Sequence, residues 1–290
     1  MELGVVFPQT EIGSDPSVVR DYAQAAEQLG YHHLATYDHV LGAHPDRFQG
    51  TFRPPYTHET PFHEPFVLFG YLAALTSRIE LATGILILPQ RQTALVAKQA
   101  AEVDLLSQGR LRLGVGLGWN FVEYEALGQN FKNRGARVEE QVQLLRRLWS
   151  EELVEFHGKY ETVDRAAILP RPTHRIPIWM GGMADSVLRR VARLADGWLP
   201  QIGPGPELQE MLERLRGYVR AAGRPVESVG IEGRLSIDRT PEAQWEATAR
   251  QWRDLGATYL SVNTMGAGLA SPRAHVDAIR RFKETVSAVV

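Results

Sequence analysis

The sequence predicts an α/β protein folded as a single (β/α)8 TIM barrel, and three observations lead to this fold class. Eight short apolar segments of strand length alternate with eight helical segments along the 290 residues. A barrel of this type takes about 250 residues as one domain. No linker, low-complexity tract or shift in composition divides the chain, so we expect one domain over residues 1–290.

The predicted strands and helices alternate along the whole chain. The strands lie at residues 3–7, 34–37, within 79–90, within 107–120, at 176–180, 196–200, 229–237 and 258–263. The helices lie at residues 16–29, 65–76, 93–106, 135–149, 185–194, 207–222, 241–255 and 272–286. Each helix carries the chain back to the edge where the strand before it began, so the strands are predicted to be parallel.

The first unit shows the signals that define these elements. Residues 3–7 are an apolar run ended by Pro8, which is typical of a buried parallel strand. Asp15 and Pro16 supply an N-cap and a first-turn proline, and Gly30 ends the helix. Later in the chain, residues 135–149 carry their apolar side chains on one stripe, as expected of a helix that packs on a sheet.

Two segments depart from this alternation. Residues 38–64 form a long connection rich in Pro, His and Gly, and a loop of this length in a compact domain is usually a lid or a binding loop. Residues 155–172 form an irregular insertion, in which we expect a hairpin around Gly158.

The main competing fold is a doubly wound open sheet. That fold usually carries its glycine fingerprint in the first βα turn, and the turn FPQTEIGSD matches the fingerprint poorly. In the favoured barrel, catalytic and binding residues are expected in the loops that follow the strands, at the carboxyl-terminal face.

Composition and charge exclude several classes of function. The formal net charge of −2 gives no case for a nucleic-acid or membrane partner. The chain has no cysteine, which excludes disulfides, a thiolate zinc site and a cysteine nucleophile. The start MELGVVFPQ reads as a strand, and no apolar run reaches the roughly 18 residues of a membrane helix, so we expect a cytoplasmic protein.

The best catalytic candidate is His39, which follows Asp38 at the end of the second strand. A histidine at a barrel mouth can donate or accept a proton near neutral pH, and the neighbouring carboxylate can orient its ring. The alternative is that Asp38 caps the loop and His39 only satisfies backbone groups. The position at the mouth favours function.

The loop after the second strand offers a second kind of site. It holds several histidines and carboxylates, which can bind metal ions in hydrolase barrels. Their spacing matches neither HxH on a strand nor HExxH on a helix, so we favour a polar lid without metal. The residues concerned are His44, His58, Glu59, His63 and Glu64.

Glycines mark the ends of the third and fourth strands. Gly84 and Ile85 interrupt an apolar strand, which indicates either a simple bulge or a backbone that a flat ligand approaches closely. In GVGLGWN, Gly116 and Gly118 resemble a dinucleotide fingerprint only weakly, and no helix start is expected close behind them. We interpret them as room for a ligand at the mouth, with Trp119 as one wall.

A third glycine pair, Gly181 and Gly182, lies between the fifth strand and a helix that opens with Asp185 and Ser186. Free backbone N–H groups at a helix start bind phosphate, and glycine lets the phosphate come close. The alternative is an ordinary turn capped by Asp185 or Ser186. Two basic residues, Arg134 and Arg137, either neutralise such a phosphate or only cover a helix.

Four blocks of the sequence together resemble the luciferase-like monooxygenase superfamily, a set of (β/α)8 barrels that use flavin or deazaflavin. They are LATYDHV, then LATGILILPQR with KQAAEVDLLSQGRLRLGVGLGWN, then RIPIWMGG, and RLADGWLP. They fall between about residues 3 and 200 in the family's order and spacing. The likeness is greatest to the subgroup that uses the deazaflavin coenzyme F420 for hydride transfer.

The resemblance implies roles for most of these residues. His39 would face the reactive carbon of the cofactor and handle a substrate proton, while Asp38 would help to hold the ring. A non-prolyl cis peptide at Gly84–Ile85 would back the ring. The cofactor phosphate would lie on Gly181 and Gly182. The resemblance also places the end of the fourth strand beside the ring, at Gly116, Gly118, Trp119 and Asn120.

The chain also departs from the best-known members of this subgroup. His44 stands near the position of a tryptophan, and Trp119 stands where the sugar-phosphate enzymes have a catalytic glutamate. We therefore expect His44 and Trp119 to contact a substrate of a different kind.

These features predict a deazaflavin-dependent oxidoreductase that passes a hydride between coenzyme F420 and a small organic substrate. The first alternative is an FMN-dependent monooxygenase that works with a separate reductase. A non-catalytic flavin-binding barrel and a metal hydrolase are further alternatives. Barrels of this family often dimerise, so a homodimer is expected.

Overall fold

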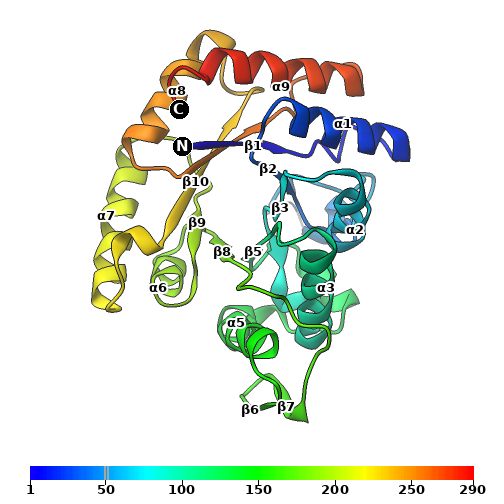
Figure 1. The fold of residues 1–290 in the computed structure, drawn as a ribbon, viewed down its shortest axis with the longest axis vertical. Helices are drawn as coiled ribbons and strands as arrows, with labels where there is room; N and C mark the ends of the chain where they lie inside the picture. Colours follow the sequence, from blue (N-terminus) through cyan, green and yellow to red (C-terminus); the bar gives the residue numbers. More distant parts are fainter. Residues whose placement is uncertain (49, 51) are drawn as a thin grey trace.

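The computed structural model describes residues 1–48, 50 and 52–290, and its strands form a closed parallel barrel (Figure 1). The barrel strands are β1 (Glu2–Val6), β2 (His33–Thr36), β3 (Glu80–Thr83) with its continuation β4 (Leu86–Ile87), β5 (Leu111–Gly116), β8 (Ile178–Gly181), β9 (Gly197–Leu199), β10 (Gly230–Ser236) and β11 (Tyr259–Asn263). Each strand pairs with the next in parallel register, and the pairing of β1 with β11 closes the ring. The predicted (β/α)8 barrel is confirmed.

Helices surround this ring, one after each barrel strand (Figure 1). The long helices are α1 (Pro16–Gln28), α2 (Pro65–Leu75), α3 (Thr93–Leu106), α5 (Arg134–Ser150), α6 (Asp185–Leu194), α7 (Pro206–Ala221), α8 (Trp245–Asp254) and α9 (Pro272–Val286). Short 3-10 turns lie at η1 (Pro45–Phe48), η2 (Leu88–Gln90), η3 (Phe131–Asn133), η4 (Val226–Ser228) and η5 (Glu242–Gln244). Among the helices that the described residues form, none has the length and apolar character to cross a bilayer.

One further helix, α4 (Phe121–Ala126), was not predicted. The expectation that no helix starts close behind the glycines of the fourth strand is wrong. Asn120 is the N-cap, and its side-chain oxygen accepts a hydrogen bond from the backbone N–H of Val122 at 3.2 Å. Such a cap satisfies an otherwise free donor of the first turn, so six residues suffice for a helix here.

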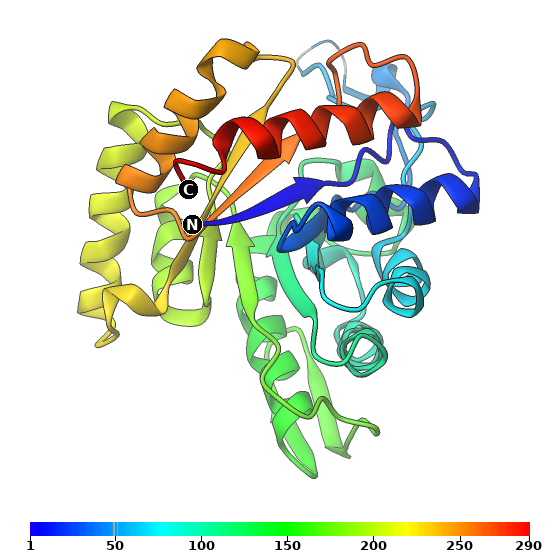
Figure 2. The same cartoon turned by 45° about the horizontal axis from the view of Figure 1, so that its top comes forward.

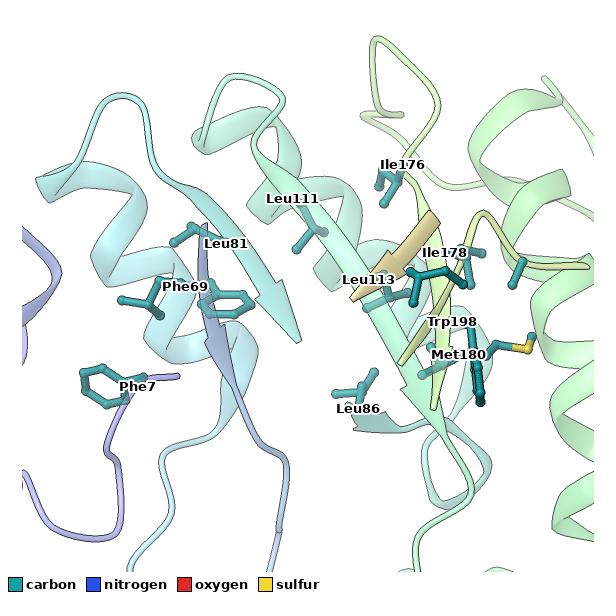
Figure 3. Packing of buried hydrophobic residues seen from close by; sticks show 14 of the residues in the cluster. Phe7, Phe69, Leu81, Leu86, Leu111, Leu113, Ile176, Ile178, Met180 and Trp198 are labelled. Carbon is teal, nitrogen blue, oxygen red and sulfur yellow. The ribbon is translucent and has the colours of Figure 1, made fainter. Parts of the chain in front are cut away.

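The main core lies between the outer face of the barrel and the helices (Figure 3). Side chains from β3, β5 and β8 point outward in this layer, as the pleat of a strand requires. Phe69 from α2 and Trp198 from β9 are fully buried there. The near-continuous apolar strands of the sequence arise because both faces of a parallel barrel strand are covered.

The inside of the barrel is charged rather than apolar in its lower layer. The guanidinium of Arg112 pairs with Glu80 at 2.6 Å and also with Glu232, and it lies 4.6 Å from the ring centres of Trp179 and Tyr259. Burial alone would raise the pKa of Glu232, but Arg112 and a neighbouring histidine hold that pKa well below its usual value. This buried network fills space that Val, Ile and Leu fill in many barrels.

Both irregular segments occur where they were predicted. β6 (Val154–His157) and β7 (Thr162–Ala166) form an antiparallel hairpin, and the N–H of Gly158 donates to the carbonyl of Glu161 at 2.9 Å in its turn. The hairpin packs along α5 (Figure 2), and its turn lies beside the start of that helix, where Glu161 pairs with Arg137 at 2.9 Å. The described part of residues 38–64 contains no strand and only the turn η1, and it leads from β2 into α2.

Candidate active site

His39 lies just beyond β2, and its side chain is only 8% exposed. Aromatic rings pack around it at centroid distances of 4.7 Å for Phe62, 5.2 Å for Tyr56 and 5.5 Å for Trp119. Its Nδ1 lies 3.2 Å from a carboxylate oxygen of Glu123. Because an ionised carboxylate only accepts, Nδ1 carries the proton, and Nε2 is left to exchange a proton with a ligand.

Glu123, in the first turn of α4, is the functional candidate that sequence reasoning missed. Its side chain is fully buried, and its carboxylate also accepts the backbone N–H groups of Val40 at 2.7 Å and Leu41 at 3.3 Å. The Nδ2 of Asn120 donates to the carbonyl of Leu41 at 3.2 Å. The Asn-x-x-Glu spacing of a capping box was the one signal in the sequence that marks this helix start.

Asp38 holds the backbone behind the mouth. One of its oxygens accepts the N–H of Ile87 at 2.8 Å, and both accept from Arg91, at 2.6 and 3.2 Å. Arg91 also pairs with Glu64 at 2.9 Å. The carboxylate of Asp38 is therefore engaged with strand three and its following turn, and its expected contact with a cofactor ring stays a prediction.

The third barrel strand is interrupted at Gly84–Ile85, between β3 and β4, as the glycine there indicated. The expected cis peptide is not found. Within residues 1–48 and 52–290 the only cis bond is Leu169–Pro170, so Gly84–Ile85 is trans. A Cβ built on Gly84 would meet only the Cβ of Ala35 at 3.5 Å and the ring of Tyr37 at 3.7 Å, which are ordinary contacts. Protein packing does not require glycine here, and a bare backbone suits a flat ring.

The packing of strand three requires Gly116 and Gly118 to be small. A Cβ on Gly116 would lie 2.3 Å from the side chain of Ile85, and one on Gly118 would lie 2.8 Å from that of Ile87. A Cβ on Gly181 would lie 3.0 Å from Ile85. These glycines make room for the strand-three interruption. Contact of the three glycines with a cofactor stays a prediction.

The start of α6 keeps its backbone donors free of any side-chain cap. The N-cap is Ala184, so the ordinary turn capped by Asp185 or Ser186 does not form. Gly182 has a φ of 131°, which few other residues adopt, and its carbonyl accepts from Trp198. These features fit a phosphate, although Asp185 adds a negative charge that is partly offset by Arg189 at 2.8 Å.

Neither basic residue proposed for that phosphate is shown to contact this turn. Arg137 is buried, and it pairs with Glu161 at 2.9 Å and donates to the carbonyl of Pro89 at 2.7 Å. Arg134 packs on the ring of Phe131 instead. The structure therefore shows both residues bound elsewhere.

The histidines of the loop do not converge. His44 is 58% exposed and lies 3.4 Å from Asp46, with the His58 ring 5.0 Å away. His63 reaches the carbonyl of Gly13 at 3.4 Å. His44 is not among the rings that contact His39, so its role toward substrate stays a prediction.

A second missed residue, Arg234 on β10, points into the mouth. It donates to the hydroxyl of Tyr37 at 2.7 Å and to Oε1 of Gln201 at 2.6 Å. A small cavity bordered by Gly84, Tyr37 and Arg234 opens at this point. The barrel interior thus ends in a polar layer directly below the proposed cofactor site.

The chain is similar to known proteins over most of its length. The profile of the Luciferase-like monooxygenase family matches residues 1–286. An uncharacterized protein of Mycobacterium tuberculosis is 36% identical over 301 residues, covering 98% of this chain and 99% of the relative. The F420-dependent glucose-6-phosphate dehydrogenase of Kribbella flavida is 34% identical over 255 residues, covering 84% of this chain and 71% of the relative.

Two solved structures share the fold at low sequence identity. The monooxygenase RslO1 from Streptomyces bottropensis has a TM-score of 0.78 and 22% identity, with 99% of each chain covered. The coenzyme F420-dependent tetrahydromethanopterin reductase from Methanopyrus kandleri has a TM-score of 0.76 and 15% identity, with 99% of this chain and 98% of the reductase covered. At this identity they support the fold alone.

Proposed function

The chain belongs to the luciferase-like monooxygenase family and is an enzyme, and from that premise we propose that it transfers a hydride between coenzyme F420 and a small organic substrate. The observation that carries the proposal is the buried pair of His39 and Glu123 at the barrel mouth, which leaves Nε2 of His39 without a protein partner in the described chain. When a hydride is added to the carbon of a carbonyl, or removed from the carbon of an alcohol, a group is needed to give or take the proton on oxygen. A histidine placed in this way can do so.

Bound F420 would supply the hydride chemistry at C5 of its deazaflavin ring. Oxidation of a substrate hydroxyl also releases a proton from oxygen, and Nε2 of His39 accepts that proton. In the reverse direction His39 donates it to the carbonyl oxygen. Glu123 keeps Nδ1 protonated, so that Nε2 is the atom offered to the substrate.

The same proposal assigns binding roles to the strand ends. The bare backbone of Gly84 and Ile85 would lie behind the cofactor ring, and Asp38 supports it through the N–H of Ile87. The uncapped N–H groups near Gly181 and Gly182 would take the phosphate. The end of β5, from Gly116 to Asn120, would lie beside the ring.

The second candidate is an FMN-dependent monooxygenase supplied by a separate reductase. Flavin and deazaflavin share the tricyclic ring and the phosphate, so the residues above suit either group. The match of residues 1–286 to the luciferase-like monooxygenase family supports this candidate. Consumption of oxygen with reduced FMN and substrate would favour it over F420 chemistry.

Equilibrium titration of the purified protein with F420 and with FMN, side by side, tests the proposal. We expect F420 to bind at least tenfold more tightly than FMN. Tight FMN binding without F420 binding would overturn the choice of cofactor. We also propose a homodimer, which light scattering on the eluting protein would show as twice the 32.5 kDa chain mass, and a cytoplasmic location.

A further inference from the structure

A groove walled by aromatic rings lies beside His39. It has a volume of about 580 Å³, and its lining includes Phe48, Phe52, Trp119, Phe121, Phe131 and Arg134; we call it the aromatic groove. Binding pockets for small molecules range over roughly 300–1,000 Å³. Trp119 belongs both to this groove and to the rings around His39, at 5.5 Å from the His39 ring.

The rings in the groove contact one another edge to face or at a tilt. Trp119 lies 5.7 Å from Phe48 and 5.4 Å from Phe52, and Phe121 lies 6.4 Å from Phe131. Aromatic side chains in such arrangements favour contact with a further ring beyond the gain from area burial. The groove therefore suits a flat, aromatic occupant.

Two arginines lie on the groove, and only one has an acidic partner. Arg47 pairs with Glu125 at 2.7 Å. Arg134 forms no ion pair with any acidic side chain in the described parts of the chain. One of its terminal nitrogens donates to the carbonyl of Phe131 at 2.8 Å, and its guanidinium stacks 3.7 Å from the Phe131 ring centre.

The remaining edge of the Arg134 guanidinium is poorly satisfied. Its Nε is buried and has no hydrogen-bond partner. Leaving a buried donor unpaired destabilises the fold, and more strongly so when the group is charged. Arg134 is also the first residue of α5, where the helix dipole disfavours a cation. An anion beside the guanidinium offsets the cost of holding this positive charge here.

We propose that the aromatic groove binds a planar aromatic molecule that carries one anionic group, such as a carboxylate, and that Arg134 is its specificity-determining residue. The carboxylate accepts from the second terminal nitrogen of Arg134, in a charge-assisted hydrogen bond. The rings of the groove hold the aromatic part. The assignment of this molecule as the substrate rests on the proposed function and on Trp119, which connects the groove to His39. The binding of the molecule to the groove does not depend on the proposed function.

Calorimetric titration of the full-length protein, without cofactor, tests the inference with two probes that share one ring system. The probes are 2-naphthoate and the neutral 2-naphthalenemethanol. We expect the naphthoate to bind at least tenfold more tightly. Arg134→Gln should weaken naphthoate binding about tenfold or more and change binding of the alcohol less than twofold, which also shows that the variant is folded.

The matched control is Lys132→Gln, which removes the same charge from an exposed residue outside the groove. It should change naphthoate binding less than twofold, and Arg134→Lys should retain part of the preference. Equal binding of the two probes, or an equal loss in both glutamine variants, would overturn the inference. If F420 binds and naphthoate does not, the inference about the groove is overturned and the proposed function stands. If naphthoate binds and F420 does not, only the proposed function is overturned.

Discussion

Nδ1 of His39 and a carboxylate oxygen of Glu123 lie 3.2 Å apart, although 84 positions separate the two residues in the chain. The same carboxylate accepts the N–H groups of Val40 and Leu41. One buried side chain on α4 therefore fixes both the ring of His39 and the backbone that carries it.

Glu123→Gln should invert the protonation of the His39 ring. The amide oxygen can still accept from Val40, which directs the amide NH2 toward Nδ1 and makes Nδ1 an acceptor. We expect turnover to fall by about 10- to 100-fold. The ¹⁵N chemical shifts of His39 should report a proton on Nε2. Glu125→Gln, two residues along the same helix and exposed, is the control, and unchanged shifts in Glu123→Gln would contradict the assignment.

His39→Ala should separate chemistry from binding. Affinity for the cofactor should stay within about tenfold, while turnover falls by about 100-fold or more, the size expected of a general acid–base. Stopped-flow measurement of cofactor reduction, alongside cofactor titration, gives both quantities. His157→Ala, an exposed residue of the hairpin outside α5, serves as the control. Unchanged turnover would remove His39 from the mechanism.

Asp38→Asn should destabilise the fold through Arg91. The asparagine can still accept from Ile87, but Arg91 loses a charged partner in a mostly buried position. Removal of one member of a buried pair costs about 3 kcal/mol or more in the free energy of unfolding. Urea denaturation of the single variants Asp38→Asn and Arg91→Gln and of their double variant measures the coupling. Asp46→Asn, 90% exposed, should be nearly neutral, and additive losses at positions 38 and 91 would argue against the pairing.

Glu232→Gln should change how the free energy of unfolding depends on pH. The pKa of Glu232 is held below its ordinary value in the folded barrel, so the unfolded chain binds a proton first as pH falls. The contribution of Glu232 to the free energy of unfolding is complete above the pKa of the unfolded state, near 4.3. This contribution is lost as the pH drops below that value. The variant should therefore lose stability at pH 7 and show a flatter decline between about pH 5 and 3. Denaturation across this range tests this, with exposed Glu246→Gln as control; an unchanged slope would contradict it.

The sequence predicted most elements because their signals are local. The helix expected at residues 93–106 has those bounds in the structure. The break at Gly84–Ile85 was also predicted from a single glycine, whereas the cis geometry implied by resemblance was wrong. A strand period or a cap depends on neighbouring residues alone, so it is visible without the fold.

Contacts between distant residues could not be predicted in the same way. The pairing of Glu123 with His39 depends on where α4 docks, and the pairing of Arg112 with Glu232 spans 120 positions across the barrel. In the sequence, Glu123, Arg112 and Glu232 each look like an ordinary surface charge. The packing of Ile85 against Gly116 likewise needs the three-dimensional course of two strands.

Arg91 binds Asp38 and Glu64, which are the first and last residues of the segment 38–64. The two ends of this segment are thus tied to one side chain on the barrel, and Glu64 also caps α2. Because lengthening a loop whose ends are fixed adds little entropic cost, we expect the barrel to tolerate exchange of the chain between these two ends. Such an exchange would replace Tyr56 and Phe62, whose rings pack on His39, and leave the barrel strands unaltered.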